Sequence, residues 1–164
     1  MDVLICSQGM VLYKRAEFEP ENFAKVVQVN LNSLMTCAGQ FYDLLKEAKG
    51  SLIIISSTAA FHATVGNPGY NASKAGAAGL TRTLGKAWAP DGIRVNGIAP
   101  GLIATKMTKV TTDNPKRRDA TVRSIPLGRI GDPDDMAGLS LFLASPLSNY
   151  IVGQTIIADG GLLL

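Results

Sequence analysis

Short apolar segments rich in β-branched residues alternate along this chain with longer segments in which apolar residues recur every three or four positions. This alternation predicts parallel βαβ units joined by right-handed crossovers. The expected strands cover residues 3–6, 51–56, 93–99 and 155–158, and the expected helices cover 21–48, 70–88 and a segment that starts near 132. We therefore expect one α/β domain over residues 1–164, with a doubly wound parallel sheet between helical layers (α/β/α).

Local signals mark the boundaries of these elements. Residues 51–56 (Ser-Leu-Ile-Ile-Ile-Ser) form a continuous apolar run, which predicts a strand buried on both faces. Gly50 is expected to end the first long helix, and residues 66–69 (Gly-Asn-Pro-Gly) are expected to form a loop. Residues 102–126 are polar and irregular, with some helix. A capping aspartate, a proline and two further acids at 132–135 predict a helix start rather than a metal site.

Composition narrows the classes of function. The net charge is only +3, and the one basic cluster, at residues 116–118, is followed at once by Asp119. We interpret it as a solvated face rather than a nucleic-acid site. No apolar run is long enough to span a membrane, and the start lacks the pattern of a signal peptide. Cys6 and Cys37 form no metal-ligand pattern, so we expect a reduced, intracellular and cytoplasmic protein without a metal.

Three residues carry candidate chemistry. Tyr70 and Lys74 are four residues apart, so on a helix they share a face. A nearby ammonium lowers the pKa of a phenol, which would let Tyr70 act as a general acid or base. Ser57 follows a predicted strand, at the edge where open α/β sheets carry their functional groups, and its hydroxyl could bind a carbonyl oxygen. Taken alone, a Tyr-x-x-x-Lys pair is more often an exposed helix stripe.

The surrounding motifs give this pair its significance. Ser57 stands thirteen residues before Tyr70, and residues 93–101 read Ile-Arg-Val-Asn-Gly-Ile-Ala-Pro-Gly. Asn30 lies in Val-Asn-Leu-Asn, and further matching segments follow at 129–137, 142–145, 150–154 and 159–161. Together, and in this order, these segments resemble the short-chain dehydrogenase/reductase family over nearly the whole chain. The resemblance implies a Rossmann-type fold and an NADP- or NAD-dependent oxidoreductase that acts on a small carbonyl or alcohol.

The resemblance also implies roles for individual residues. Tyr70 would exchange a proton with the substrate oxygen, Ser57 would orient that oxygen, and Asn30 would hold a water in a proton relay. Lys74 would lower the pKa of Tyr70 and bind the nicotinamide ribose. Contacts with the cofactor are expected from Gly9, Tyr70, Lys74, Pro100, Gly101, Ile103 and Thr105, and residues 106–124 match the family's substrate lid. His62, the only histidine, is expected at the surface or in the substrate pocket.

One family feature is missing from the sequence. A dinucleotide fold needs closely spaced glycines to bind the pyrophosphate, yet no two of the 17 glycines are separated by a single residue. The resemblance places three βα units before residue 1, so we expect a truncated, partial Rossmann-type domain. The strand at residues 3–6 should then form an exposed edge. Residues 6–9 read Cys-Ser-Gln-Gly where the family has Asn-Asn-Ala-Gly, so only Gly9 is retained.

Two functional interpretations stay open. The Ser57, Tyr70, Lys74 and Asn30 set favours an active oxidoreductase. The missing glycine loop favours an inactive isoform or fragment that pairs with full-length relatives through the helices at 21–48 and 70–89. The family commonly forms dimers or tetramers, so a homo-oligomer is expected in either case.

Overall fold

The computed structural model describes residues 1–164 and contains one four-stranded sheet. Each neighbouring pair of strands is parallel, and the spatial order follows the chain order. The strands are β1 (Val3–Cys6), β2 (Ser51–Ile55), β3 (Arg94–Pro100) and β4 (Thr155–Ala158). The four predicted strands and their parallel pairing are confirmed.

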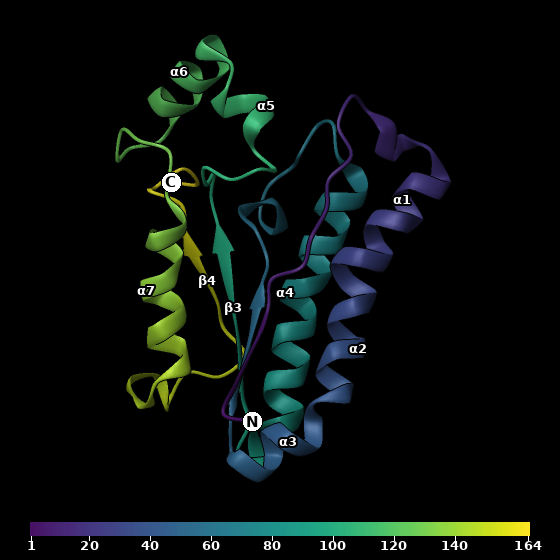
Figure 1. Cartoon of the computed structure of the whole chain (residues 1–164), viewed down its shortest axis with the longest axis vertical. Helices are drawn as coiled ribbons and strands as arrows, with labels where there is room; N and C mark the ends of the chain where they lie inside the picture. Colours follow the sequence, from purple (N-terminus) through teal and green to yellow (C-terminus); the bar gives the residue numbers. More distant parts are fainter.

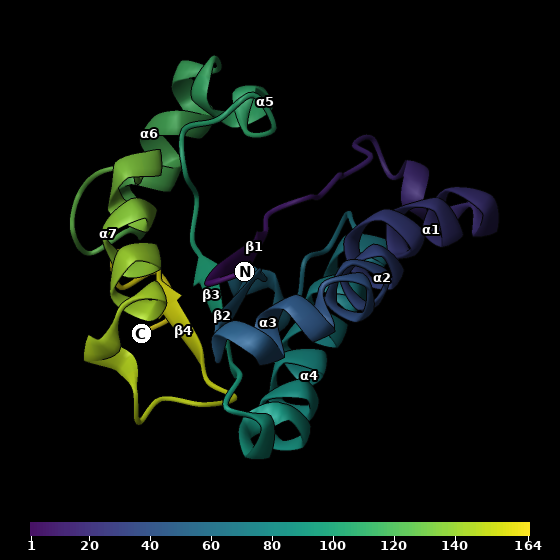
Figure 2. The same ribbon diagram turned by 60° about the horizontal axis from the view of Figure 1, so that its bottom comes forward.

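Helices cover both faces of this sheet. Helix α4 (Pro68–Trp88) packs against β3 on one face, and α7 (Pro133–Ala144) packs against β2 and β3 on the other. Figure 1 shows α1 and α2 outside α4, and Figure 2 shows the strands between α7 and the α2–α4 side. The expected three-layer α/β/α arrangement is therefore confirmed.

Strand β2 occupies the core between these layers. Leu52 and Ile54 belong to the apolar cluster that faces α2 and α4, whereas Ile53 packs with Ile98 and Leu143 of α7. Successive side chains of a strand point to opposite faces, so a fully buried strand needs an unbroken apolar run. The prediction of a strand buried on both faces is thus confirmed.

Strand β1 lies at one edge of the sheet. It pairs with β2 alone, and the Ile5 side chain keeps 46% of its surface exposed. The other edge is β4, which pairs only with β3. The expectation of an exposed edge at residues 3–6 is confirmed for the described chain.

The prediction of one continuous helix over residues 21–48 is wrong, because the structure divides this segment into three α-helices. A π-helical turn interrupts it at Gln28–Asn32, and a break follows at Phe41, whose φ and ψ are −104° and 6°. Apolar spacing of three or four residues does not distinguish an α-turn from a π-turn, which holds one extra residue. The segments on either side are α1 (Pro20–Val27), α2 (Ser33–Gln40) and α3 (Tyr42–Ala48).

The predicted end of the helix at residues 49–50 is confirmed, but Gly50 has a different role from the one predicted. The residue that leaves α3 in the left-handed conformation is Lys49, with φ of 51°. A Cβ on Gly50 would lie 2.7 Å from the carbonyl oxygens of Met1 and Asp2. The glycine is therefore required because the start of β1 passes over it, and not because the helix ends there.

Two other boundaries differ from the predictions. Helix α4 begins at Pro68, within the predicted loop, because proline fits the first turn of a helix. The irregular segment 102–126 contains α5 (Lys109–Thr112) and α6 (Pro115–Ser124). The predicted start of α7 is confirmed: Asp132 caps it and Asp135 binds back to the Asp132 amide at 2.7 Å. Short 3₁₀ turns lie at Ala16–Phe18, Thr58–Ala60, Ala89–Asp91 and Pro146–Ser148.

No helix has both the length and the apolarity to cross a bilayer.

Candidate active site

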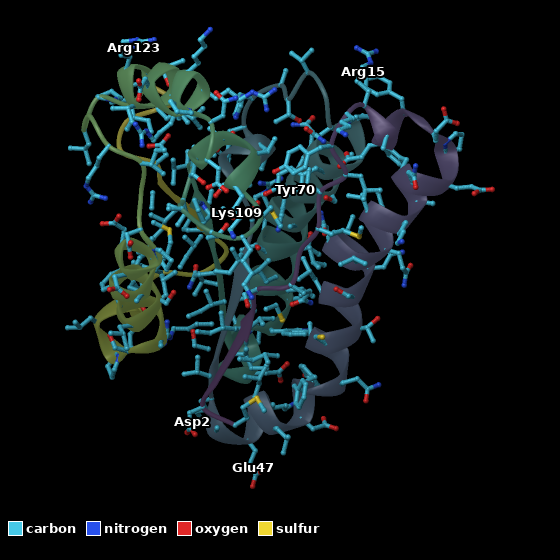
Figure 3. All side chains as sticks on the ribbon, turned by 45° about the horizontal axis from the view of Figure 1, so that its top comes forward. Asp2, Arg15, Glu47, Tyr70, Lys109 and Arg123 are labelled. Atoms are coloured by element: carbon cyan, nitrogen blue, oxygen red, sulfur yellow. The ribbon has the colours of Figure 1, made fainter.

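A cavity of about 490 Å³ opens at the carboxyl ends of β1, β2 and β3. Open α/β sheets carry their ligand sites at this edge. Eight residues singled out from the sequence line the cavity: Gly9, Ser57, Tyr70, Lys74, Pro100, Gly101, Ile103 and Thr105. In Figure 3, Tyr70 lies between the segment that carries Lys109 and the segment that carries Arg15. The fold therefore brings these eight residues together from four separate segments of the chain.

Sequence reasoning missed part of the cavity wall. Met107 and Thr108 belong to the expected lid, but no single residue there was distinguished. Helix α7 was predicted only as a helix with no part in the site, yet one of its faces lines the cavity. Its apolar sequence gives no signal for this contact, since packing alone decides which residues of the helix meet an empty space. The additional wall residues are Ile5, Ser7, Ile55, Ser56, Pro133, Met136, Ala137 and Ser140.

Lys74 is the only charged side chain in the cavity wall and is 4% exposed. Its Nζ donates to the Ile55 carbonyl oxygen at 2.9 Å and lies 5.7 Å from the Tyr70 ring centre. Burial lowers the pKa of Lys74 to about 8. A Cβ at Gly9 would lie 3.5 Å from this Nζ, so the glycine leaves one side of the ammonium open.

Tyr70 is held in the first turn of α4. Burial raises the pKa of its phenol, the neighbouring Ser57 hydroxyl partly lowers it, and the Glu17 carboxylate raises it. The prediction that Lys74 lowers this pKa below 10 is therefore wrong for the protein described here. The reason is that desolvation outweighs the other influences, and the Lys74 ammonium binds the backbone of Ile55 rather than the phenol.

Ser57 begins the 3₁₀ turn that follows β2. Its Oγ accepts a hydrogen bond from the Ala59 amide at 3.1 Å, which leaves the hydroxyl proton free to be donated. Asn71 of α4 donates to the carbonyl oxygens of Ala59 and His62 and so fixes this turn against the helix that carries Tyr70. His62 itself is exposed and does not line the cavity, so of its two expected places the surface is confirmed.

Asn30 does not line the cavity but lies directly behind it, in the π-turn, with 0% of its surface exposed. Its Oδ1 accepts from the Met10 amide at 2.7 Å, and its Nδ2 donates to the Met10 carbonyl at 2.8 Å and to Ser73 Oγ at 3.1 Å. The side chain thus fixes the turn that contains Gly9 against α4. Its part in a proton relay stays a prediction.

The remaining candidates have structural roles. Cys6 is buried, and burial followed by the nearby Cys37 raises its pKa to about 11, which disfavours a reactive thiolate. No group of three histidine, cysteine or acidic side chains is placed to hold a metal ion. The basic residues 116–118 lie exposed on α6, where Arg118 pairs with Asp119 at 3.3 Å.

Comparison with known proteins shows the family to which this chain belongs. The family model described as enoyl-(acyl carrier protein) reductase matches residues 1–163. The 2-dehydro-3-deoxy-D-gluconate 5-dehydrogenase of Bacillus subtilis (strain 168) is 41% identical over 98% of this chain and 64% of its own length. The 3-oxoacyl-(acyl-carrier-protein) reductase FabG of Chlamydia pneumoniae is 40% identical over 99% of this chain and 65% of its own length.

A solved structure shows the same fold. The gluconate 5-dehydrogenase from Burkholderia cenocepacia J2315, in complex with NADP and tartrate, has a TM-score of 0.94 and 30% identity. The match covers 99% of this chain and 64% of that one. The chain belongs to the short-chain dehydrogenase/reductase family, of which the matched family model is a member group. It spans slightly less than two thirds of the length of the first relatives described above.

Proposed function

We propose that this chain carries the catalytic residues of an NAD(P)-dependent oxidoreductase that interconverts a carbonyl and a secondary alcohol. The observation that carries the proposal is the meeting of Ser57, Tyr70 and Lys74 in one cavity at the carboxyl edge of the sheet. Tyr70 would exchange a proton with the substrate oxygen, and Ser57 would donate a hydrogen bond to it. Membership of the family supports these roles.

The residues present fit the nicotinamide end of the cofactor. A lysine ammonium has three donors, and Lys74 has one protein acceptor, the Ile55 carbonyl, so donors remain for ribose hydroxyls. Gly9 keeps the adjoining space open, and Pro100, Gly101, Ile103 and Thr105 form the facing wall. The bound cofactor would supply or accept the hydride. Relatives of known structure hold NADP, and either NADP or NAD is proposed here.

The rest of the cofactor site is a separate proposal. We infer that the glycine-rich loop and the first three βα units correspond to the part of the relatives that this chain does not cover. The open edge of β1 supports this inference, because it offers unpaired backbone groups where a further strand could pair.

The protonation state of Tyr70 defines its part in the proton transfer. Burial keeps the pKa of Tyr70 above its ordinary value, so the phenol is protonated at neutral pH. A protonated phenol can donate to a carbonyl oxygen, which is the proton transfer that accompanies reduction. In the proposed interconversion, Tyr70 would therefore act as the acid when the carbonyl is reduced and as the base when the alcohol is oxidised.

A second candidate function is an oligomerisation partner without activity. The observation in its favour is exposed apolar surface: Leu141 is 71% and Leu147 80% exposed, and Tyr150 is fully exposed. These three residues lie within ten positions of one another in the chain, and contiguous exposed apolar surface is typical of protein contacts. The proposal is a homo-oligomer, or an assembly with a full-length relative.

One experiment separates the two functions. The purified chain is titrated with NADPH and NADH while the nicotinamide fluorescence is followed, and carbonyl substrates are then screened. The screen starts with keto derivatives of sugar acids and 3-oxoacyl thioesters, after the names of the relatives. Saturable binding with turnover that is lost in Tyr70→Phe and kept in Tyr150→Phe would support the enzyme. Absence of binding at millimolar cofactor would leave the second candidate.

A further inference from the structure

Glu17 is a buried carboxylate beside the site, and it has no role in the chemistry proposed above. It is 1% exposed, and no lysine or arginine forms an ion pair with it. Its Oε1 accepts from the Leu12 amide at 2.9 Å and from Asn67 Nδ2 at 3.3 Å, and its Oε2 accepts from the Tyr70 amide at 2.8 Å. All three partners donate, and a carboxylate that only accepts matches the ionised form.

The contact with Tyr70 replaces a missing helix cap. Helix α4 begins at Pro68, and the side chain of Asn67, which precedes it, caps no helical amide. The Tyr70 amide lies in the first turn, where no helical carbonyl is in reach, so it would otherwise be an unpaired buried donor. Glu17 supplies the acceptor from 53 positions earlier in the chain. Negative charge is also favourable at this end of a helix.

The same carboxylate connects Tyr70 to both neighbouring loops. Leu12 belongs to the segment after β1, next to Tyr13, and Asn67 belongs to the segment between Ser57 and α4. Asn67 in addition donates to the Leu12 carbonyl at 2.9 Å. A Cβ on Gly69 would lie 3.3 Å from Glu17 Oε2, so the helix start is packed closely on the carboxylate. A shift of Glu17 would therefore move the first turn of α4.

We propose that Glu17 is a positioning residue for Tyr70, which binds the Tyr70 amide and fixes the first turn of α4 against both neighbouring loops. The inference rests on the proposed function of Tyr70, but its test does not need turnover. A negative charge disfavours the phenolate, and the Glu17 charge is accordingly among the causes that raise the Tyr70 pKa. Glu17 would thereby keep Tyr70 in the form that donates a proton.

The other titratable groups around Tyr70 are few. Lys74 faces it from α4 itself, and Tyr13 faces it from the segment after β1, where burial, Tyr70 and Glu17 all raise the Tyr13 pKa. The lid and α7 contribute no titratable side chain to the cavity wall. A change in the titration of Tyr70 can therefore be assigned to Glu17 if Lys74 and Tyr13 are unchanged.

Two substitutions separate the effect of the Glu17 charge from the effect of the length of its side chain. Glu17→Gln keeps the length and removes the charge, whereas Glu17→Asp keeps the charge and shortens the side chain. The matched control is Ser51→Ala, which removes a buried hydrogen bond to the Leu143 carbonyl far from the cavity. The tyrosines are labelled with ¹³C at Cζ and titrated by NMR, with Tyr70→Phe used to assign the Tyr70 signal. Circular dichroism checks that each variant is folded at every pH.

We expect the pKa of Tyr70 to be lower in Glu17→Gln than in the wild type, because the negative charge that disfavours the phenolate is removed. In Glu17→Asp it should stay raised while the Tyr70 amide exchanges with solvent faster than in the wild type. Ser51→Ala should change neither the pKa of Tyr70 nor the exchange rate of its amide. An unchanged Tyr70 titration in Glu17→Gln would overturn the inference, and so would an equal shift in Ser51→Ala. If Glu17→Gln does not fold, unaltered amide exchange in Glu17→Asp is the overturning result. Absence of turnover in the wild type would count against the proposed function alone.

Discussion

Lys74 Nζ donates a hydrogen bond to the Ile55 carbonyl oxygen at 2.9 Å, and this bond joins the carboxyl end of β2 to α4. Ile55 is the last residue of β2, so the contact fixes the ammonium where the strand ends. The position costs stability, because a charged group is taken out of water. Burial accordingly lowers the pKa of Lys74 to about 8.

This relationship predicts a stability change with pH. The folded-state pKa of Lys74 is lowered from 10.5, so between pH 8 and 10 the unfolded chain binds the additional proton. The contribution of Lys74 to the free energy of unfolding should therefore rise with pH over this window, by about 2–3 kcal/mol. Lys74→Met should remove that rise and stabilise the chain at pH 7. Urea unfolding of the wild type and of Lys74→Met at pH 7 and pH 10 measures this change. An equal change in the free energy of unfolding between the two pH values in both proteins would contradict the prediction.

A second prediction concerns the contact between Tyr13 and the lid. Tyr13 Oη donates to the Met107 carbonyl oxygen at 2.7 Å and so connects the segment after β1 with the lid across the cavity. Tyr13→Phe removes a bond worth about 0.5–1.5 kcal/mol, so the lid should open roughly two- to tenfold more often. Trypsin cleavage after Lys106 and Lys109 would report this change. Tyr150→Phe, on the exposed surface, is the control, and equal cleavage rates in the two variants would refute the role of the contact.

Asn30 gives a prediction about the turn that contains Gly9. Asn30→Ala leaves the Met10 amide and carbonyl without their partner in a buried place, which should cost about 2–4 kcal/mol of the free energy of unfolding. Asn32→Ala alters the same π-turn, but its side chain is exposed and binds only Gln28, so the loss there should stay below about 0.5 kcal/mol. Chemical denaturation gives the free energies of unfolding of the two variants and of the wild type. Similar losses in both variants would show that the side chain of Asn30 does not fix the turn.

Gly50 gives a prediction about the packing at the start of β1, and Gly39 serves as its control. Gly50→Ala would bring a Cβ to 2.7 Å from two backbone oxygens, which cannot move aside as a flexible side chain could. We expect a loss of about 1–3 kcal/mol of stability. Gly39→Ala lies in α2 with no atom within 4 Å of the new Cβ, and it should stabilise the helix by about 0.5–1 kcal/mol. Thermal unfolding gives the sign of each change, and a tolerated alanine at position 50 would be the contrary result.

Patterns that depend on neighbours in the chain were readable from the sequence. The apolar run of β2 predicts burial on both faces, and Asp132 with Pro133 predicts the start of α7, since each signal is local. Spacing alone also placed Tyr70 and Lys74 on one helix face, and the order of the family motifs indicated that Ser57 would join them. The glycine at position 50 shows the limit, because its requirement comes from residues nearly fifty positions away.

What the sequence by itself determined is that the strands are parallel, that helical layers cover the sheet, and that polar residues gather at one edge of it. Only the tertiary structure decided the electrostatics of that edge. The direction of the Tyr70 pKa follows from burial and from Glu17, and the charge of Lys74 is directed to the backbone of Ile55. The physical reason is that desolvation and charge interactions depend on distances in space, which residue types and spacing along the chain do not contain.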